Sequence, residues 1–202
     1  MCGAGAMRAR LPHELRKPVV PARCITGTRR ATSCLVSDRI DLYRAIHVGI
    51  RKFLFDLIVH AGEIDYRSDA EWTGLAGRAR ETFQLLRNHA RVEEEVFQRA
   101  LVDRVPEAVA WAHTEHDREA DELGALDALV NRIGRAARDD RSALGVQLYR
   151  ALGAFCADYL LHMAREEEEL MPVFWKHFDD TELAELRRRA HSRMASEQQP
   201  TA

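Results

Sequence analysis

The sequence predicts an all-α protein, arranged as an antiparallel up-down four-helix bundle. Apolar residues recur at helical spacing in four long segments, and no segment alternates apolar and polar residues for any length. The connections between these segments are short, about 4 to 8 residues, so neighbouring helices are expected to run in opposite directions. A chain of 202 residues, 46% of them hydrophobic, has enough apolar surface for one such core.

Signals for helix starts define the first two segments. The first helix is expected over residues 37–60, with Ser37 as its N-cap. The second helix begins at Ser68, where Glu71 completes a capping box, and is expected to run to about residue 102. Both helices then contain a long apolar stripe that faces the bundle interior.

Three further segments complete the predicted helices. Pro106 suits the first turn of a third helix, because a helix start leaves its backbone N–H groups unpaired anyway. A fourth helix is expected to open at Ser142 and to run towards Phe178. Residues 179–182 then cap a short fifth helix, which is expected to end near Met194.

Charge is unevenly distributed along the chain. Residues 1–36 hold seven Lys or Arg and one acid, whereas residues 37–202 hold 23 bases and 31 acids, a net charge of −8. The first 36 residues also lack apolar periodicity, so they are expected to be a disordered basic tail, a transit peptide, or sequence that precedes the natural start. The bundle domain is expected over residues 37–194, and a disordered C-terminus over residues 195–202.

Composition argues against several classes of protein. No stretch of 18 apolar residues occurs, so no membrane span is expected. The formal net charge of −2 gives no reason to expect nucleic-acid binding. Three of the four cysteines lie in the first 36 residues and no CxxC pair occurs. This argues against a disulfide framework or a zinc ribbon, and a reducing, cytoplasmic location is expected.

Histidine interrupts the apolar stripe of every long helix. In an ordinary bundle this stripe consists of Leu, Ile, Val and Ala. A buried imidazole needs a polar partner, because burying it alone is costly. Each of the four long segments nevertheless places one histidine on its apolar side, roughly midway along. These residues are His47, His89, His116 and His162.

Two of these histidines are followed four residues later by a glutamate. Residues i and i+4 share one face of a helix, so His89 and Glu93 point the same way, as do His162 and Glu166. The pattern also repeats along the chain, because the first and second histidines are 42 residues apart and the third and fourth are 46 apart. Two helical hairpins with the same ligands predict a site with pseudo-twofold symmetry.

Six such groups suit two metal ions better than one. Each ion is expected to take two of the four imidazoles, while Glu93 and Glu166 bridge the pair. One bridging hydroxide would then leave two divalent ions with a modest net positive charge. Mixed imidazole and carboxylate ligands with open positions favour iron over calcium or magnesium. The other glutamates of the two acidic runs are expected to be solvated charges: Glu94, Glu95, Glu167, Glu168 and Glu169.

Four motifs in this pattern resemble the hemerythrin-like family of HHE cation-binding domains. They are DLYRAIHVGIRKFLFDL, NHARVEEEVF, AHTEHDREADEL and YLLHMAREEEELMPVF, and the resemblance covers residues 37–180. It implies a four-helix bundle with a non-heme di-iron centre, two iron ions joined by a bridging oxo or hydroxo group, with manganese or zinc as alternatives. Carried over residue by residue, the implied metal ligands are His47, His89, Glu93, His116, His162 and Glu166.

Three side chains near these ligands leave alternatives open. The family's oxygen carriers use two histidines four apart on the third helix, whereas His113 and His116 are three apart here. His113 is therefore a fifth ligand, an outer contact or an exposed residue. Tyr43 and Tyr159 fall one turn from a histidine, where they are expected to fill the core or to contact a bound ligand.

The resemblance implies a metal- and small-ligand-binding protein rather than an enzyme. The expected ligand is dioxygen or nitric oxide, bound for sensing, storage or detoxification. Ferritin-like oxidases use Glu-x-x-His on two helices, and no glutamate lies three residues before any of the four histidines. The alternatives are a di-iron enzyme that acts on peroxide or nitric oxide, and an iron-responsive interaction module.

Overall fold

The computed structural model describes residues 39–197, and within this range the chain is helical and contains no strand. The all-α class expected from the sequence is therefore confirmed for these residues. Residues 1–36, expected to be a disordered tail, lie outside the described range, as do residues 198–202. None of the described helices is both long enough and apolar enough to cross a lipid bilayer.

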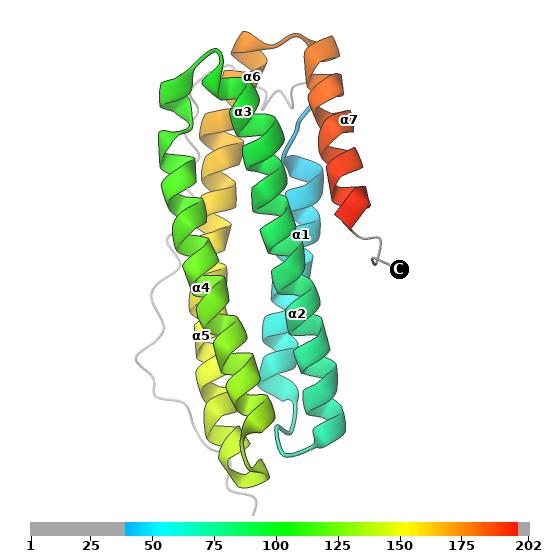
Figure 1. The fold of residues 1–202 in the computed structure, drawn as a ribbon, viewed down its shortest axis with the longest axis vertical. Helices are drawn as coiled ribbons and strands as arrows, with labels where there is room; N and C mark the ends of the chain where they lie inside the picture. The colour runs from blue at the N-terminus through cyan, green and yellow to red at the C-terminus, as the bar shows by residue number, and fades with distance from the viewer. Residues whose placement is uncertain (1–38, 198–202) are drawn as a thin grey trace, which may run out of the picture. The chain divides into compact units, whose positions relative to one another are not determined.

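Four long helical rods lie side by side and alternate in direction (Figure 1). Two rods are single long helices, one of them preceded by a 3₁₀ turn, and each of the other two contains a π-helical turn followed by a short α-helix. In chain order the elements are α1 (Arg44–Glu63), α2 (Asp69–Val92), η2 (Glu93–Gln98), α3 (Arg99–Val102), η3 (Pro106–Ala108), α4 (Ala110–Arg135), α5 (Arg138–Arg165), η4 (Glu166–Leu170), α6 (Met171–His177) and α7 (Asp180–Glu197). Both α1 and α4 pack against α2 and α5.

The start of α1 differs from the prediction. The sequence predicts Ser37 as the N-cap, but α1 begins at Arg44 and Ser37 lies outside the described residues. The carboxylate of Asp41 accepts hydrogen bonds from the backbone N–H groups of Tyr43 and Arg44, both at 2.9 Å. Asp41 performs the capping because a side-chain oxygen must lie within a few residues of the first turn.

The predicted starts of α2 and α7 are confirmed. The hydroxyl of Ser68 accepts a hydrogen bond from the backbone N–H of Glu71 at 3.4 Å, and the Glu71 carboxylate accepts one from the N–H of Asp65 at 2.9 Å. At α7, Asp179 and Glu182 exchange two reciprocal hydrogen bonds of 2.9 Å. These contacts satisfy backbone donors that would otherwise have no intrahelical partner.

Two helix boundaries lie beyond the expected positions. The helix α5 begins at Arg138, four residues before Ser142, and Asp139 and Asp140 occupy its first turn. Acidic side chains there are stabilised by the positive end of the helix dipole, which explains the earlier start. The helix α7 continues to Glu197, past the end expected near Met194.

The two π-helical turns are not predicted by the sequence. Glu93 is the first residue of η2, and Glu166 is the first residue of η4. Such turns are rare and occur frequently at functional sites. Pro172 lies in the first turn of α6, directly after η4, where a helix tolerates a residue without an N–H group.

The apolar core consists of two clusters separated along the bundle. Ile50 and Leu86 belong to one cluster, whereas Tyr43 and Val92 belong to the other. The first histidine of the predicted site lies between Tyr43 and Ile50 on α1, and the second lies between Leu86 and Val92 on α2. The polar residues therefore form a layer between two apolar regions.

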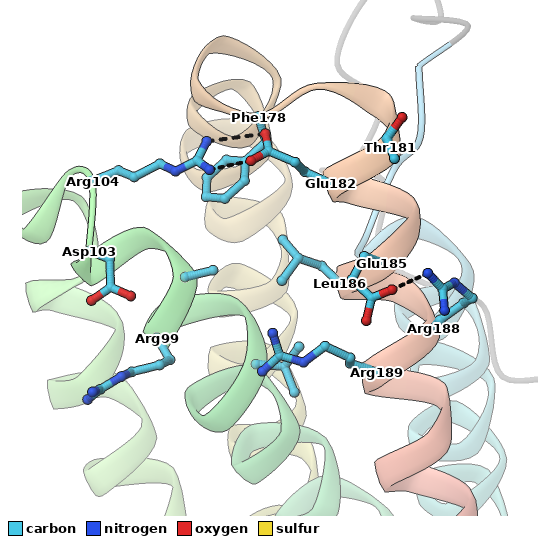
Figure 2. Close-up of a pocket in the computed structure, with 12 residues that line it drawn as sticks. Arg99, Asp103, Arg104, Phe178, Thr181, Glu182, Glu185, Leu186, Arg188 and Arg189 are labelled. Atoms are coloured by element: carbon cyan, nitrogen blue, oxygen red, sulfur yellow. Dashed lines mark hydrogen bonds and ion pairs between the residues drawn. The ribbon is translucent and has the colours of Figure 1, made fainter.

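The helix α7 packs against α2 and η2, and a contact network around Arg104 anchors its start (Figure 2). The guanidinium of Arg104 pairs with the carboxylate of Glu182 and donates to the backbone carbonyl of His177. It also lies over the ring of Phe178, 3.9 Å from the ring centroid. These contacts hold α7 beside the π-helical turn that begins at Glu93.

Candidate metal centre

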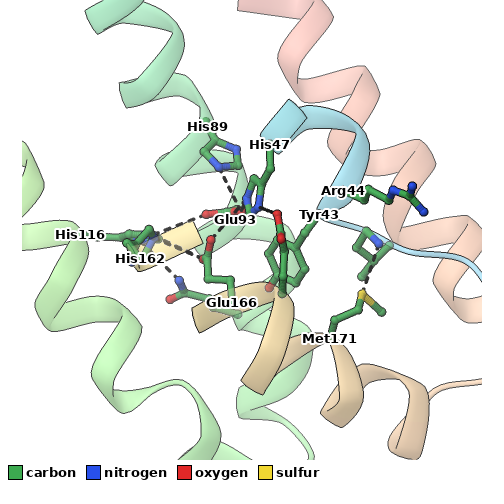
Figure 3. A network of polar contacts seen from close by, with 12 residues as sticks. Tyr43, Arg44, His47, His89, Glu93, His116, His162, Glu166 and Met171 are labelled. Atoms are coloured by element: carbon green, nitrogen blue, oxygen red, sulfur yellow. Dashed lines mark hydrogen bonds and ion pairs between the residues drawn. The ribbon is translucent and has the colours of Figure 1, made fainter. Parts of the chain in front are cut away.

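All six residues predicted as ligands meet in the interior of the bundle (Figure 3). The four imidazoles come from four different helices, and the two carboxylates come from the first residues of η2 and η4. None of the six is more than 4% exposed. In Figure 3, Glu93 and Glu166 lie between the imidazoles. The six residues are His47, His89, Glu93, His116, His162 and Glu166.

These residues divide into two overlapping groups. One group joins His47 and His89 to both glutamates, and the other joins His116 and His162 to the same two glutamates. Within each group, one ligand atom of every residue lies within 4.8 Å of the others. The two groups could hold two metal ions, with two imidazoles for each ion and both carboxylates shared.

The nitrogen–oxygen distances within the groups are short. The Nε2 atom of His89 lies 3.3 Å from Oε1 of Glu93. The Nε2 atom of His47 lies 3.4 Å from Oε2 of Glu166, and that of His162 lies 3.5 Å from Oε1 of Glu166. Imidazole and carboxylate ligands bind zinc at roughly 2.0–2.2 Å, so two ligands of one such ion are about 3 to 3.5 Å apart.

The ligand atoms of the six residues have no hydrogen-bond partner among the described residues. This applies to Nε2 of all four histidines and to both carboxylate oxygens of Glu93 and Glu166. Buried polar atoms are nearly always hydrogen-bonded, because leaving one unpaired is costly. The eight atoms are four imidazole nitrogens and four carboxylate oxygens that face one another, and divalent transition-metal ions bind to such nitrogen and oxygen atoms. These residues therefore fit a pair of metal ions.

Glu167 fixes the orientation of His47. Its Oε1 lies 2.8 Å from the outer nitrogen of His47, Nδ1, and accepts a hydrogen bond of 2.8 Å from Arg51. A histidine that binds a metal usually gives its second N–H to a carboxylate, which sets the ring orientation. The expectation that Glu167 is a solvated charge is therefore wrong.

The histidine of α4 has a similar outer partner. Nδ1 of His116 lies 3.1 Å from Oε1 of Glu94 and 3.4 Å from Nε2 of Gln98. Glu94 directly follows Glu93, as Glu167 follows Glu166, and both Glu93 and Glu166 belong to the two groups. The side chain of Glu94 is 40% exposed, so it is solvated as expected, but its carboxylate also contacts a buried imidazole.

A third outer carboxylate, Glu115, contacts the histidine of α5. Its Oε2 lies 2.9 Å from Nδ1 of His162, and its Oε1 accepts a hydrogen bond of 2.9 Å from Arg165. The ring of Trp111 packs edge-on against His162 and lies under the Arg165 guanidinium, 3.8 Å from the ring centroid. Carboxylate, guanidinium and indole together hold this imidazole in place.

His89 differs from the other three histidines. Its outer nitrogen has no hydrogen-bond partner among residues 39–197, and burial lowers its pKa. The side chain lines a cavity of about 550 Å³ beneath α7, which also reaches Glu93. Most of this lining is apolar; it includes Leu42, Ile46, Leu85, Val92, Phe97 and Met194.

Burial opposes protonation of the other histidines, but the neighbouring carboxylates outweigh it. Glu166 raises the pKa of His47 to about 11 and that of His162 to about 10. Glu93 raises the pKa of His116 to about 9. In the metal-free protein these three imidazoles are protonated at neutral pH, so metal binding must displace their protons.

Glu119 is a buried carboxylate near the centre that the sequence reasoning missed. It is 2% exposed, and its Oε1 lies 3.7 Å from Nδ1 of His162. Burial raises its pKa to about 7. Nothing in the sequence distinguishes it, because it is one of five acidic residues between positions 115 and 122.

Position shows that His113 is exposed and that both tyrosines fill the core. His113 is exposed on α4 and belongs to neither metal-binding group. Tyr43 and Tyr159 are buried members of the two apolar clusters, and burial raises the pKa of both. The Tyr43 ring lies 5.3 Å from the His47 ring, and its hydroxyl has no hydrogen-bond partner among the described residues.

Comparison with known proteins gives a distant relationship. No family model matches the chain. It is 22% identical over 160 residues to F-box/LRR-repeat protein 5 of Xenopus tropicalis, which covers 79% of this chain and 23% of that protein. The protein of the same name from Xenopus laevis is 22% identical over 167 residues, or 81% and 24%. The chain thus spans about a quarter of the length of these curated relatives, and its buried His/Glu clusters fit an HHE site.

The π-helical turns change the direction of the acidic residues that follow Glu93 and Glu166. Each turn begins at one of these two glutamates, so the following acidic residues are rotated relative to the helix that precedes them. In the sequence, the only feature that marks both π-helical turns is a run of glutamates, EEE after Val92 and EEEE after Arg165. Their equivalent positions in the two hairpins could have indicated a shared role.

Proposed function

We propose that this chain is a hemerythrin-like protein, an up-down four-helix bundle that holds two iron ions and binds dioxygen or nitric oxide. The observation that carries the proposal is the set of eight buried, unpartnered donor atoms from four imidazoles and two carboxylates. The HHE motifs and the distant similarity to F-box/LRR-repeat protein 5 support the same family. Sensing, storage and detoxification are roles that such binding would serve.

The donor set supports the assignment of iron. Each of the two groups would hold one ion, and Glu93 and Glu166 would bridge both. Four nitrogen donors and shared carboxylates suit iron better than calcium or magnesium, which prefer all-oxygen surroundings. Manganese and zinc accept the same donors and are the outcomes that metal analysis must distinguish.

The surroundings of His89 support a small, weakly polar ligand. Bound iron would supply open coordination positions for dioxygen or nitric oxide. The residues of this chain supply the path, because the apolar cavity beneath α7 reaches both His89 and Glu93. Small molecules of low polarity partition into such surroundings more readily than water does.

Metal analysis followed by ligand binding tests this function. We expect two iron ions per chain in protein purified from cells, and a change in the absorption spectrum when the anaerobic ferrous protein meets nitric oxide. The His116→Ala variant should lose about half of its iron, whereas His113→Ala is the matched control on α4 and should retain all of it. Zinc or manganese in place of iron, or no spectral response, would contradict the proposal; consumption of many equivalents of nitric oxide would indicate the enzymatic alternative.

A second candidate function is an iron-responsive module, and the same buried atoms favour it. Metal loading replaces buried protons by ions at eight atoms that have no hydrogen-bond partner among the described residues, so the stability of the fold should depend on it. We expect a chelator to lower the helicity and the thermal midpoint of the protein. An apo form as stable as the loaded form would remove this candidate while leaving ligand binding untouched.

A further inference from the structure

Glu119 is a buried carboxylate without a lysine or arginine partner, and its one ion-pair contact is with the imidazole of His162 at 3.7 Å. It is 2% exposed, and neither carboxylate oxygen has a hydrogen-bond partner among the described residues. The outer carboxylates Glu115 and Glu167 each pair with an arginine, but no Lys or Arg among residues 39–197 lies within ion-pair distance of Glu119. A buried carboxylate in this state is unfavourable unless a cation compensates it.

Glu119 breaks the pseudo-twofold symmetry of the site, because the equivalent position in the other hairpin is apolar. His47 on α1 and His116 on α4 occupy equivalent positions in the two hairpins. Three residues after His47 the chain has Ile50, which is fully buried in an apolar cluster, whereas three residues after His116 it has Glu119. The two halves of the site therefore have equal numbers of imidazoles but unequal numbers of nearby carboxylates.

The position of Glu119 assigns it to one half. Its carboxylate lies 3.7 Å from His162, and with His116 and Tyr159 it lines a cavity of about 330 Å³ between α2 and α4. Both histidines belong to the same metal-binding group. The cavity that reaches His89 and the other half lies under α7 instead and is not lined by Glu119.

We propose that Glu119 is a third buried carboxylate of the metal centre, beside Glu93 and Glu166, and stabilises only the ion held by His116 and His162. This inference rests on the proposed function, because it needs two bound ions. Two divalent ions held with two ionised glutamates and one hydroxide would carry a net charge of +1, and an ionised Glu119 would bring the sum over the buried groups to zero. Since the added charge lies on one side, the two ions bind with different affinities.

A purely structural role predicts a different response to mutation. Glu119→Gln keeps the size of the side chain and removes its charge. Without a metal, this change removes a buried carboxylate but also its 3.7 Å contact with His162, which Glu115 already pairs at 2.9 Å, so the apo protein should be about as stable as the wild type. With metal, the same change should weaken metal binding, so a lower metal affinity with unchanged apo stability is expected only if Glu119 stabilises the ion.

The test is a titration of chelator-treated protein with ferrous iron under anaerobic conditions, in competition with a chromophoric chelator. We expect two binding steps for the wild type. In Glu119→Gln the tighter step should weaken by about 10- to 100-fold, the usual effect of losing a group around the first ligands. The control is Glu122→Gln on the same helix, where the half-buried carboxylate pairs with Arg118 and belongs to neither metal-binding group.

The outcomes separate this inference from the proposed function. Two ions bound by the wild type, with the tighter step weakened in Glu119→Gln and the apo thermal midpoint not lowered, support it. Two ions bound with both steps unchanged in Glu119→Gln overturn it and leave the proposed function intact. Weakened binding together with a lower apo midpoint also overturns it, because it indicates a structural role. A wild type that binds no pair of ions overturns both proposals.

Discussion

The Nδ1 atom of His47 lies 2.8 Å from Oε1 of Glu167, although 120 residues separate them in the chain. This contact joins α1 to η4, the π-helical turn that also contains Glu166. One pair of side chains thus connects the packing of two helices to the orientation of a buried imidazole. Any shift of α1 along η4 would therefore break this contact and change the orientation of the imidazole.

Loss of the carboxylate at position 167 should weaken metal binding without removing a ligand. We expect Glu167→Gln to lower the affinity of the protein for iron by about 10-fold or more, because the neutral amide holds the His47 ring less firmly and makes it a weaker donor. Chelator competition measures this affinity. The exposed neighbour supplies the control, and equal effects of Glu167→Gln and Glu168→Gln would refute the prediction.

Removing a glutamate that belongs to both groups should lower the iron content more than removing a histidine that belongs to one. Glu166 belongs to both metal-binding groups, whereas His89 belongs to one. We therefore expect Glu166→Ala to lose both ions and His89→Ala to retain about half of the iron, as measured by elemental analysis after purification. The prediction fails if both variants retain the same amount of iron.

Filling the cavity beneath α7 should slow ligand association. Ala45 is an exposed residue of α1 that lines this cavity. We expect Ala45→Trp to slow nitric oxide association with the ferrous protein by about tenfold, equivalent to ~1.4 kcal/mol of barrier, with the iron content unchanged. Stopped-flow absorption measures the rate. Ala154→Trp is the control, because Ala154 is also exposed and lines a separate cavity between α4 and α5; equal slowing in both variants would argue against this path.

The stability of the metal-free protein should fall as pH rises. The pKa values of His47, His162 and His116 in the folded protein are about 11, 10 and 9, above the ordinary value of 6.5. The folded state therefore binds more protons than the unfolded state between pH 6.5 and 11, so this stabilisation is complete below pH 6.5 and is lost towards pH 11.

Metal should reverse this dependence. Iron competes with protons for the same imidazoles, so the stabilisation that it provides should increase as pH rises from about 5 to 8. Urea unfolding of the apo and loaded forms across this range measures both slopes. Parallel pH dependences of the two forms would show that protons and metal do not share these sites.

The helical pattern was sufficient to predict the class of fold and the six buried polar groups of the site. Residues four apart lie on one helix face, and a histidine on an apolar stripe must find a partner inside the bundle. The pattern does not show which acidic residue is buried where several acidic residues lie close together in the sequence. Glu119 is surrounded in sequence by other acids, and its burial depends on how α4 packs against α2 and α5.

The roles of Glu94 and Glu167 show a second limit of the pattern. Each directly follows a glutamate that belongs to both groups, and consecutive residues of a helix point in different directions, about 100° apart in an α-helix and less in the π-helical turns that contain these pairs. One residue of each pair therefore points to the centre of the bundle, and the next points to a neighbouring helix. The sequence does not specify which residue that neighbour presents.

The sequence by itself determined the helical class, the repeated histidine pattern and the residues able to bind two ions. Only the tertiary structure decided that His47 groups with His89 and His116 with His162, which outer carboxylates hold the rings, and where the chain forms π-helical turns. The physical reason is that helical periodicity fixes which side chains share a face, whereas contacts between helices depend on packing between segments far apart in the chain.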